Sequence, residues 1–206
     1  MLPLSRIGAV VLAAGLSSRM KDVKMNLPLP DGRTVLETTL DNLFSAGVSP
    51  VVLVLGCHEA AIRAGCRSLD RVIPVRNPRY EEGMFTSVQT GVAELVRRGG
   101  RDAFLLQPGD SPFSPPETVE ALRAVYEEGV RDIVIPSFEG RGGHPLLLSL
   151  SYAPEILGQD LPQGLKSLLA AHPDRVCRIP LAHPGLLRDL DTPDDYRAVL
   201  AALKKN

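Results

Sequence analysis

A segment near the amino terminus combines small residues, hydroxyls and cations in the manner of a phosphate-binding loop. It runs from Leu12 to Lys24 and leaves an apolar run of strand length at residues 7–13. Small side chains let backbone N–H groups approach phosphate oxygens, Arg19 can bind them bidentately, and Lys24 can act as a mobile point charge. The segment therefore predicts a polyphosphate site; an ordinary strand-to-helix turn with solvated charges is the alternative.

This loop differs from two common nucleotide-binding loops. It lacks both the GxxxxGK[ST] pattern of P-loop hydrolases and the GxGxxG pattern of dinucleotide-binding oxidoreductases. Neither of these two classes of enzyme is therefore favoured.

Two aspartates stand where predicted strands end, and each is a candidate ligand for a divalent cation. Asp110 follows the apolar run at 103–106, and Asp191 follows the apolar run at 186–190. Mg²⁺ takes one or two carboxylates together with substrate phosphates and waters. A turn aspartate is the alternative for Asp110, and a helix N-cap is the alternative for Asp191.

A third segment is a candidate site for a second, phosphorylated substrate. Asn77, Gly83 and Ser87 follow the third predicted strand and lead into a helical pattern. Helix N-termini bind anions, so Ser87 and its neighbouring N–H groups could hold a phosphate; a plain helix cap is the alternative. His144 follows two glycines, and it could donate hydrogen bonds to that phosphate or pack behind its own loop.

Strand and helix patterns alternate from one end of the chain to the other. Continuous apolar runs, typical of strands covered on both faces, lie at 7–13, 51–55, 72–75, 103–106, 133–135, 146–148 and 186–190. Helical patterns lie at 34–46, 86–98, 115–128, 164–171 and 193–204. We therefore predict one α/β domain over residues 1–206 with a largely parallel sheet, in which ligands bind beyond the carboxyl ends of the strands.

Composition narrows the classes of partner. The 23 Lys+Arg and 24 Asp+Glu give a net charge of -1, and 44% of the residues are hydrophobic, which argues against a nucleic-acid scaffold or a disordered chain. The apolar run at 7–16 is too short to span a bilayer and ends in a basic segment, so we reject a signal peptide or membrane anchor. Three cysteines without a CxxC pair favour reduced thiols in a cytoplasm, and few aromatic residues make a monomer the default expectation.

Five short motifs of the chain resemble those of one known family. The opening LAAGLSSRMKDVK is similar to LAAGxSxRMGxxK, with Lys21 in place of the motif glycine. QPGDSP and DLDTPDDY resemble LPGDxP and DxDTPEDY, while the segment from Asn77 to Gly91 matches N-x5-GMxxSVxxG and RGGHP resembles RxGHP. Together these motifs resemble the MobA-like nucleotidyltransferase family, in particular its molybdenum cofactor cytidylyltransferase branch.

The resemblance implies a three-layer, Rossmann-like nucleotidyltransferase domain that joins a nucleoside triphosphate to a phosphorylated acceptor and releases pyrophosphate. For this branch the substrates are CTP and molybdenum-bound molybdopterin, the cofactor is Mg²⁺, and a molybdoenzyme receives the finished cofactor. The choice of CTP rests on LAAG, because guanylyl relatives read LAGG. No nucleic acid or membrane partner is implied.

The resemblance also assigns residues to roles. It makes Arg19, Lys24 and Asp110 catalytic, and it makes Asp110 and Asp191 the metal ligands. The acceptor-binding residues are then Asn77, Gly83, Ser87 and His144. The nucleotide-binding residues are Leu12, Ala13, Ala14, Gly15, Ser17, Ser18, Arg19, Lys24, Pro108 and Gly109.

Two other functions stay open at the level of sequence. One is a nucleotidyltransferase of the same fold that uses GTP or a sugar phosphate. The other is a non-catalytic nucleotide- or cofactor-binding module, in which Lys21 in place of the motif glycine marks an altered phosphate loop.

Overall fold

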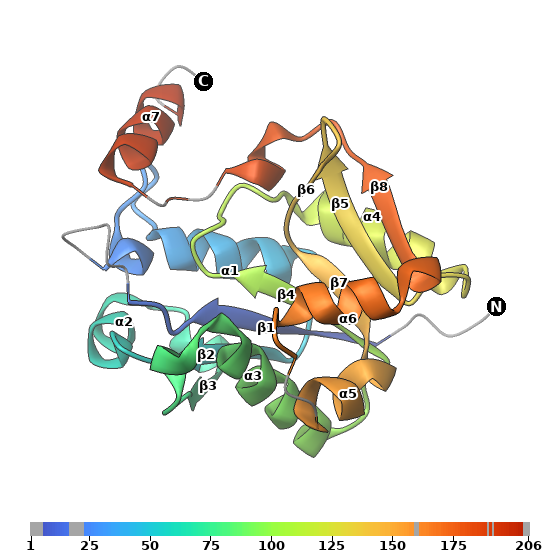
Figure 1. Cartoon of the computed structure of the whole chain (residues 1–206). Coiled ribbons are helices and arrows are strands. Elements are labelled where there is room, and N and C mark those ends of the chain that lie inside the picture. Colours follow the sequence, from blue (N-terminus) through green and yellow to red (C-terminus); the bar gives the residue numbers. More distant parts are fainter. Residues whose placement is uncertain (1–5, 17–22, 159–160, 189, 191, 204–206) are drawn as a thin grey trace.

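The strands of the protein form one twisted sheet, which crosses Figure 1 from β3 at the lower left to β8 at the upper right. The computed structural model describes residues 6–16, 23–158, 161–188, 190 and 192–203. Within these ranges the sheet has eight strands in the order β3-β2-β1-β4-β7-β5-β6, with β8 paired to β5. Their bounds are β1 Ile7–Ala13, β2 Val51–Leu55, β3 Ile73–Arg76, β4 Ala103–Pro108, β5 Ile133–Phe138, β6 Arg141–Gly142, β7 Leu146–Ser149 and β8 Val176–Pro180.

The pairing of the central strands determines where a site can form. Strands β3, β2, β1 and β4 run parallel, and β5 and β8 are also parallel to each other. Strand β7 pairs antiparallel with both β4 and β5. In the register of β1 with β4, Leu12 lies opposite Pro108, so the segments after these two strands leave the sheet side by side.

Helices cover both faces of the sheet, as Figure 1 shows, because the central strands are apolar on both sides. Along β1, Ala9, Val11 and Ala13 point into one core, and Val10 and Leu12 point into the other. The first core receives side chains of α1 Val35–Ser45, α2 Glu59–Gly65 and α4 Pro116–Glu127. The second receives side chains of α3 Met84–Arg98, α5 Ala153–Gly158 and α6 Leu165–Ala171.

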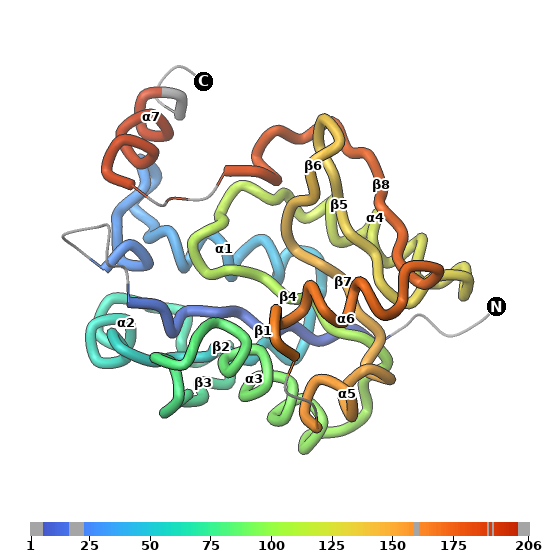
Figure 2. Tube along the Cα trace, in the orientation of Figure 1, coloured from blue at the N-terminus to red at the C-terminus, as the bar shows by residue number. Residues whose placement is uncertain are grey.

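The last helix lies apart from both of these cores. Helix α7, Pro193–Leu203, packs Val199 and Tyr196 against Leu29 and Val35, which precede and begin α1. Figure 2 shows this carboxyl-terminal helix beside the early part of the chain. None of the helices in the described ranges has the length and apolar character needed to cross a membrane.

The predicted α/β class with a mostly parallel sheet is confirmed, but one predicted strand is wrong. Of the run at 186–190, the described residues include the end of a 3-10 helix, Pro184–Leu187, and no strand. A short apolar run does not by itself distinguish a strand from a buried helical turn. The sheet position is taken by β8, whose sequence VCRIP is too mixed to stand out as an apolar run.

A buried carboxylate fixes the start of α1, the helix that supports the central loops. Thr34 and Glu37 form a reciprocal capping box, in which the Thr34 amide donates to Glu37 Oε2 at 2.8 Å and the Glu37 amide donates to Thr34 Oγ1 at 3.2 Å. The Arg67 backbone amide and Nε donate to Glu37 Oε1 at 2.8 and 3.1 Å. The hydrogen bonds from Arg67 lower the pKa of Glu37 to about 2, so this carboxylate is charged throughout the neutral range.

We expect Glu37→Gln to lower the free energy of unfolding by about 2 kcal/mol at pH 7, because it removes the charge that the cap and Arg67 stabilise. A lowered pKa in the fold stabilises the protein above the ordinary carboxyl pKa, and this contribution disappears as the pH falls from about 5 to about 2. Urea unfolding of the wild type and the variant at several pH values measures it. The difference should shrink toward zero at low pH; a constant difference, or one no larger than that of the exposed Glu128→Gln control, would contradict the assignment.

Candidate active site at the carboxyl ends of β1 and β4

A cavity of about 410 Å³ opens where β1 and β4 end. Four segments that are far apart in the sequence contribute to its walls. The lining residues are Leu12, Ala14, Gly15, Lys24, Met25, Tyr80, Met84, Ser87, Pro108, Asp110 and His144. The structure thus brings together residues that the sequence assigns separately to the nucleotide, the metal and the acceptor.

The end of β1 supplies the floor of the cavity. Leu12 and Ala14 line it, whereas Ala13 points into the core on the opposite face of the sheet, as the strand alternation requires. Gly56, directly after β2, lies against this turn: a Cβ there would stand 2.6 Å from the Ala14 carbonyl oxygen. A side chain at residue 56 would therefore displace the backbone that carries Ala14 and Gly15.

The loop that carries Asp110 is held by hydrogen bonds from three sides. The Gly109 amide donates to the Leu12 carbonyl at 2.9 Å, which ties this loop to the end of β1. The buried Gln107 side chain donates through Nε2 to the carbonyls of Pro108 and Ser111 at 3.0 and 3.1 Å. These contacts fix the turn from inside the sheet.

Helix α1 holds the same loop from outside the sheet. The Thr39 hydroxyl donates to the Gly109 carbonyl at 3.1 Å, and Asn42 Nδ2 donates to the Pro112 carbonyl at 2.8 Å. Asp110 is consequently directed into the cavity with only 9% of its surface exposed. A loop held at this many points keeps its carboxylate in one place, as a catalytic or metal-binding group requires.

Lys24 and Asp110 form an ion pair across the cavity, between Nζ and Oδ2. Both side chains are largely buried, with 15% and 12% of their surfaces exposed. Lys24 lies on a short 3-10 helix, Lys24–Asn26, which is seated on α2. Asn26 Nδ2 donates to the Ala61 carbonyl at 2.7 Å, and Gly65 leaves room for it, since a Cβ there would stand 2.6 Å from that nitrogen.

Asn77 supports the amino-terminal end of α3 and does not line the cavity itself. It is buried, and its Nδ2 donates to Thr86 Oγ1 at 2.8 Å and to Ser87 Oγ at 2.9 Å. Gly83 precedes α3 with a φ of 113°, a backbone conformation that residues with a side chain rarely adopt. Asn77 and Gly83 therefore set the position of Ser87, which does line the cavity.

The His144 loop is set by a glycine that allows close contact. A Cβ at Gly143 would lie 2.5 Å from the Leu186 carbonyl oxygen, so this loop rests directly on the 3-10 helix at Pro184–Leu187. The Ser114 hydroxyl donates to the His144 carbonyl at 2.6 Å. These contacts leave the His144 side chain at the wall of the cavity.

Several predicted site residues lie outside the described residues: Ser17, Ser18, Arg19 and Asp191. The described residue before Asp191 does reach the site, because the Leu190 amide donates to the Asp110 carbonyl at 3.4 Å. Asp195, in the first turn of α7, helps to cap that helix: its Oδ2 accepts from the Thr192 amide at 2.8 Å and from the Thr192 hydroxyl at 2.7 Å.

Four residues at or behind the cavity are absent from the sequence-based assignment: Met25, Gly56, Tyr80 and Met84. A glycine directly after a strand is a signal that could have revealed Gly56, and Met25 is adjacent to Lys24. Tyr80 and Met84 lie inside the segment predicted for the acceptor. A hydrogen bond with Glu81 raises the pKa of the Tyr80 hydroxyl above its usual range.

The donor set at Asp110 fits a hard divalent cation that is completed by its substrate. In the described part of the chain, no three His, Cys, Asp or Glu side chains gather as a ready-made metal site. Mg²⁺, however, is commonly held by one or two carboxylates together with phosphate oxygens and waters. The Asp110 carboxylate at the cavity wall can supply one such ligand once Lys24, its present ion-pair partner, moves to a phosphate.

Comparisons with known proteins agree with one another. A model of the MobA-like NTP transferase domain matches residues 9–176. Molybdenum cofactor cytidylyltransferase of Escherichia coli K12 is 28% identical over 195 residues, which cover 94% of this chain and 95% of that protein.

The solved structures include Rv0371c from Mycobacterium tuberculosis H37Rv, with a TM-score of 0.78 and 31% identity, over 97% of this chain and 100% of that one. A crystal structure of Rv0371c in complex with manganese has a TM-score of 0.72 and 29% identity over the same shares of the two chains.

We expect the Lys24–Asp110 pair to show a coupling energy of about 1–3 kcal/mol in a double-mutant cycle. Lys24→Met and Asp110→Asn should each destabilise the fold, because each leaves a largely buried partner without its counter-ion, and the double variant should lose less than the sum. Urea denaturation of the four proteins measures this coupling. The exposed Asp194–Arg197 pair is the control, for which we expect a coupling below about 0.5 kcal/mol. Equal couplings for the two pairs would contradict the special role of the first.

Proposed function

Because the chain belongs to the MobA-like NTP transferase family, we propose that it is a nucleotidyltransferase that transfers CMP from CTP to molybdenum-bound molybdopterin. The match covers residues 9–176, and the Escherichia coli relative is named for this reaction. The observation that carries the proposal is the Lys24–Asp110 pair in a cavity lined by the ends of β1 and β4, the start of α3 and the His144 loop.

In the proposed reaction an oxygen of the acceptor phosphate attacks the α-phosphorus of CTP. A new phosphorus–oxygen bond forms, the bond between the α-phosphorus and the bridging oxygen breaks, and pyrophosphate leaves with the electron pair. A phosphate monoester has its second pKa near 6, so the nucleophile is already ionised at neutral pH and needs no general base. The remaining difficulty is the repulsion between two anions.

The chain's own cations address that repulsion. Lys24 lies at the cavity wall and can exchange the Asp110 carboxylate for a phosphate oxygen of the triphosphate. Arg19 is assigned to the same triphosphate by the sequence. The backbone from Leu12 to Gly15 provides a surface without bulky polar side chains along which phosphates can lie.

Asp110 and Asp191 would hold the divalent cation. When bound, Mg²⁺ would neutralise phosphate charge and orient the reacting groups. The manganese complex of Rv0371c supports a divalent metal in a protein of this fold. Asp110 in turn depends on Gln107, Thr39 and Asn42, which fix its loop.

We assign the acceptor phosphate to the wall formed by Ser87 and His144. Both side chains line the same cavity as the β1 turn, and Ser87 lies in the first turn of α3, where the helix dipole favours an anion. Asn77 and Gly83 act by holding this turn in place. In-line attack requires the acceptor oxygen and the leaving group to lie on opposite sides of the α-phosphorus, so the acceptor phosphate must be held in a fixed position.

The nucleotide and the acceptor are identified by a panel of substrates. Pyrophosphate release is measured with CTP, GTP, ATP and UTP, with and without molybdenum cofactor, in Mg²⁺ and in chelator. Release that requires CTP, cofactor and metal together is the expected result. Release with GTP or with a sugar phosphate would move the assignment to another transferase of this fold, and tight nucleotide binding without release would indicate a binding module.

We expect Asp110→Asn to lower kcat for pyrophosphate release by at least about 100-fold, because it removes a charged metal ligand. Thermal unfolding is measured alongside, so that a loss of fold is separated from a loss of chemistry. Asp70→Asn is the matched control. Asp70 lies just before β3, at the amino-terminal end of a parallel strand, whereas the cavity lies beyond the carboxyl ends of such strands. Unimpaired turnover in the Asp110 variant would refute the metal assignment.

A further inference from the structure

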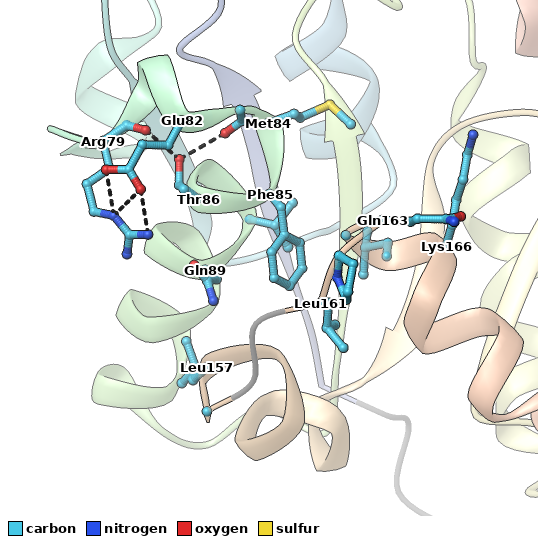
Figure 3. Close-up of a pocket in the computed structure, with 16 residues that line it drawn as sticks. Arg79, Glu82, Met84, Phe85, Thr86, Gln89, Leu157, Leu161, Gln163 and Lys166 are labelled. Atoms are coloured by element: carbon cyan, nitrogen blue, oxygen red, sulfur yellow. Dashed lines mark hydrogen bonds and ion pairs between the residues drawn. The ribbon is translucent and has the colours of Figure 1, made fainter.

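A second and larger cavity, of about 780 Å³, lies between the start of α3 and the segment that leads into α6 (Figure 3). Its size is within the range of small-molecule sites. Residues of the α3 side that line it include Arg79, Met84, Phe85 and Gln89, and residues of the facing side include Leu161, Gln163, Leu165 and Lys166.

The two cavities meet at Met84. This side chain lines both of them, and it is 68% exposed although it is large and apolar. Ser87 and Val88, three and four residues after Met84 on α3, line the first and the second cavity respectively. Because an unbranched thioether adapts its shape readily, Met84 can lie against a ligand that extends from one cavity into the other.

Phe85 offers an aromatic surface that is held in position. A Cβ on Gly164 would stand 3.3 Å from Phe85 Cβ and 3.4 Å from its ring atoms Cγ and Cδ2, so the Gly164 backbone lies close to this side chain. Gly164 has a φ of +57°, which L side chains rarely adopt. Figure 3 shows the ring extending into the space between α3 and Leu161. A ring fixed in this way can stack on a flat ligand with little loss of conformational freedom.

Amide and cationic groups surround this apolar wall. Gln89 Nε2 donates to the Ile156 carbonyl at 3.0 Å, which fixes the orientation of this amide at the cavity wall. Gln163 is exposed on the opposite wall and supplies a second amide, and Lys166 supplies a positive charge. Arg79 and Glu82 pair at the rim, with Nη2 to Oε2 at 2.8 Å.

This combination matches one class of ligand better than others. An aromatic face binds the face of a fused heterocycle, while amide groups at the walls can donate to and accept from the lactam and amino groups at the edge of such a ring. A sugar carries many hydroxyl groups, which find few hydrogen-bond partners on the wall of Phe85, Leu161 and Leu165. A triphosphate has its cations and small backbone residues in the first cavity.

We propose that this second cavity binds the fused pterin ring of the acceptor, with Phe85 and Gln163 determining specificity, while the acceptor phosphate reaches Ser87 in the first cavity. The inference rests on the proposed function only in naming the acceptor. Recognition of a flat heterocycle by these side chains is a property of the cavity itself.

The test uses the full-length protein and 6-hydroxymethylpterin as a fluorescent probe. We expect Phe85→Leu, which keeps an apolar side chain but removes the aromatic face, to weaken probe binding about tenfold. Gln163→Ala, an exposed position, should weaken it severalfold without changing the thermal midpoint. Binding of CTP, measured by calorimetry, should stay within about twofold. Phe44→Leu on α1 is the matched control, because Phe44 packs with the first core on the opposite face of the sheet.

The outcomes separate this inference from the proposed function. Probe binding that Phe85→Leu and Gln163→Ala leave unchanged, or no probe binding by the wild type at millimolar concentration, would overturn the pterin subsite. Probe binding that depends on Phe85 would support the subsite. If the same protein releases pyrophosphate from none of the nucleotides tested, the transferase is overturned while the subsite stands. Release with a sugar phosphate and no probe binding would overturn the subsite and leave a transferase of another specificity.

Discussion

The ion pair between Lys24 and Asp110 is the interaction on which the arrangement of the first cavity depends. Both charges are largely removed from water, so in the protein without substrate each side chain requires the other as its counter-ion. In the proposed reaction the nucleotide and its metal exchange these partners: Lys24 passes to a phosphate and Asp110 passes to the cation. The two opposite charges balance each other in the cavity before binding, and the protein groups that the proposed exchange uses are already in place.

The groups behind this pair are mostly uncharged and closely packed. Gly56 lets the Ala14 backbone, and Gly65 lets the Asn26 side chain, approach at distances that a Cβ would forbid. Thr39 and Gln107 hold the Asp110 loop through its carbonyls. Such contacts restrict motion without adding charge to the site. Phosphoryl chemistry gains most from this kind of positioning, since the protein forms no covalent bond with the substrate.

In the proposed reaction, the first cavity serves catalysis and the second serves recognition of the acceptor. The first contains the cation, the carboxylate and the amino-terminal end of α3, where charge is managed. The second contains an aromatic side chain and amide groups, which can recognise the shape and polar edge of a ligand. Binding energy gained away from the reacting atoms can then be used to position them, with Met84 as the shared wall.

The sequence by itself determined the α/β class, the central strands and the loops in which Lys24, Ser87, Asp110 and His144 lie. These features are local, because a strand buried on both faces needs a continuous apolar run and the loop after it is polar. Only the tertiary structure decided that Lys24 pairs with Asp110 and that Asn77 acts from behind Ser87. It also decided that β8 completes the sheet, whereas the described residues of 186–190 form no strand. Contacts between distant segments depend on the path and packing of the whole chain, which local periodicity does not encode.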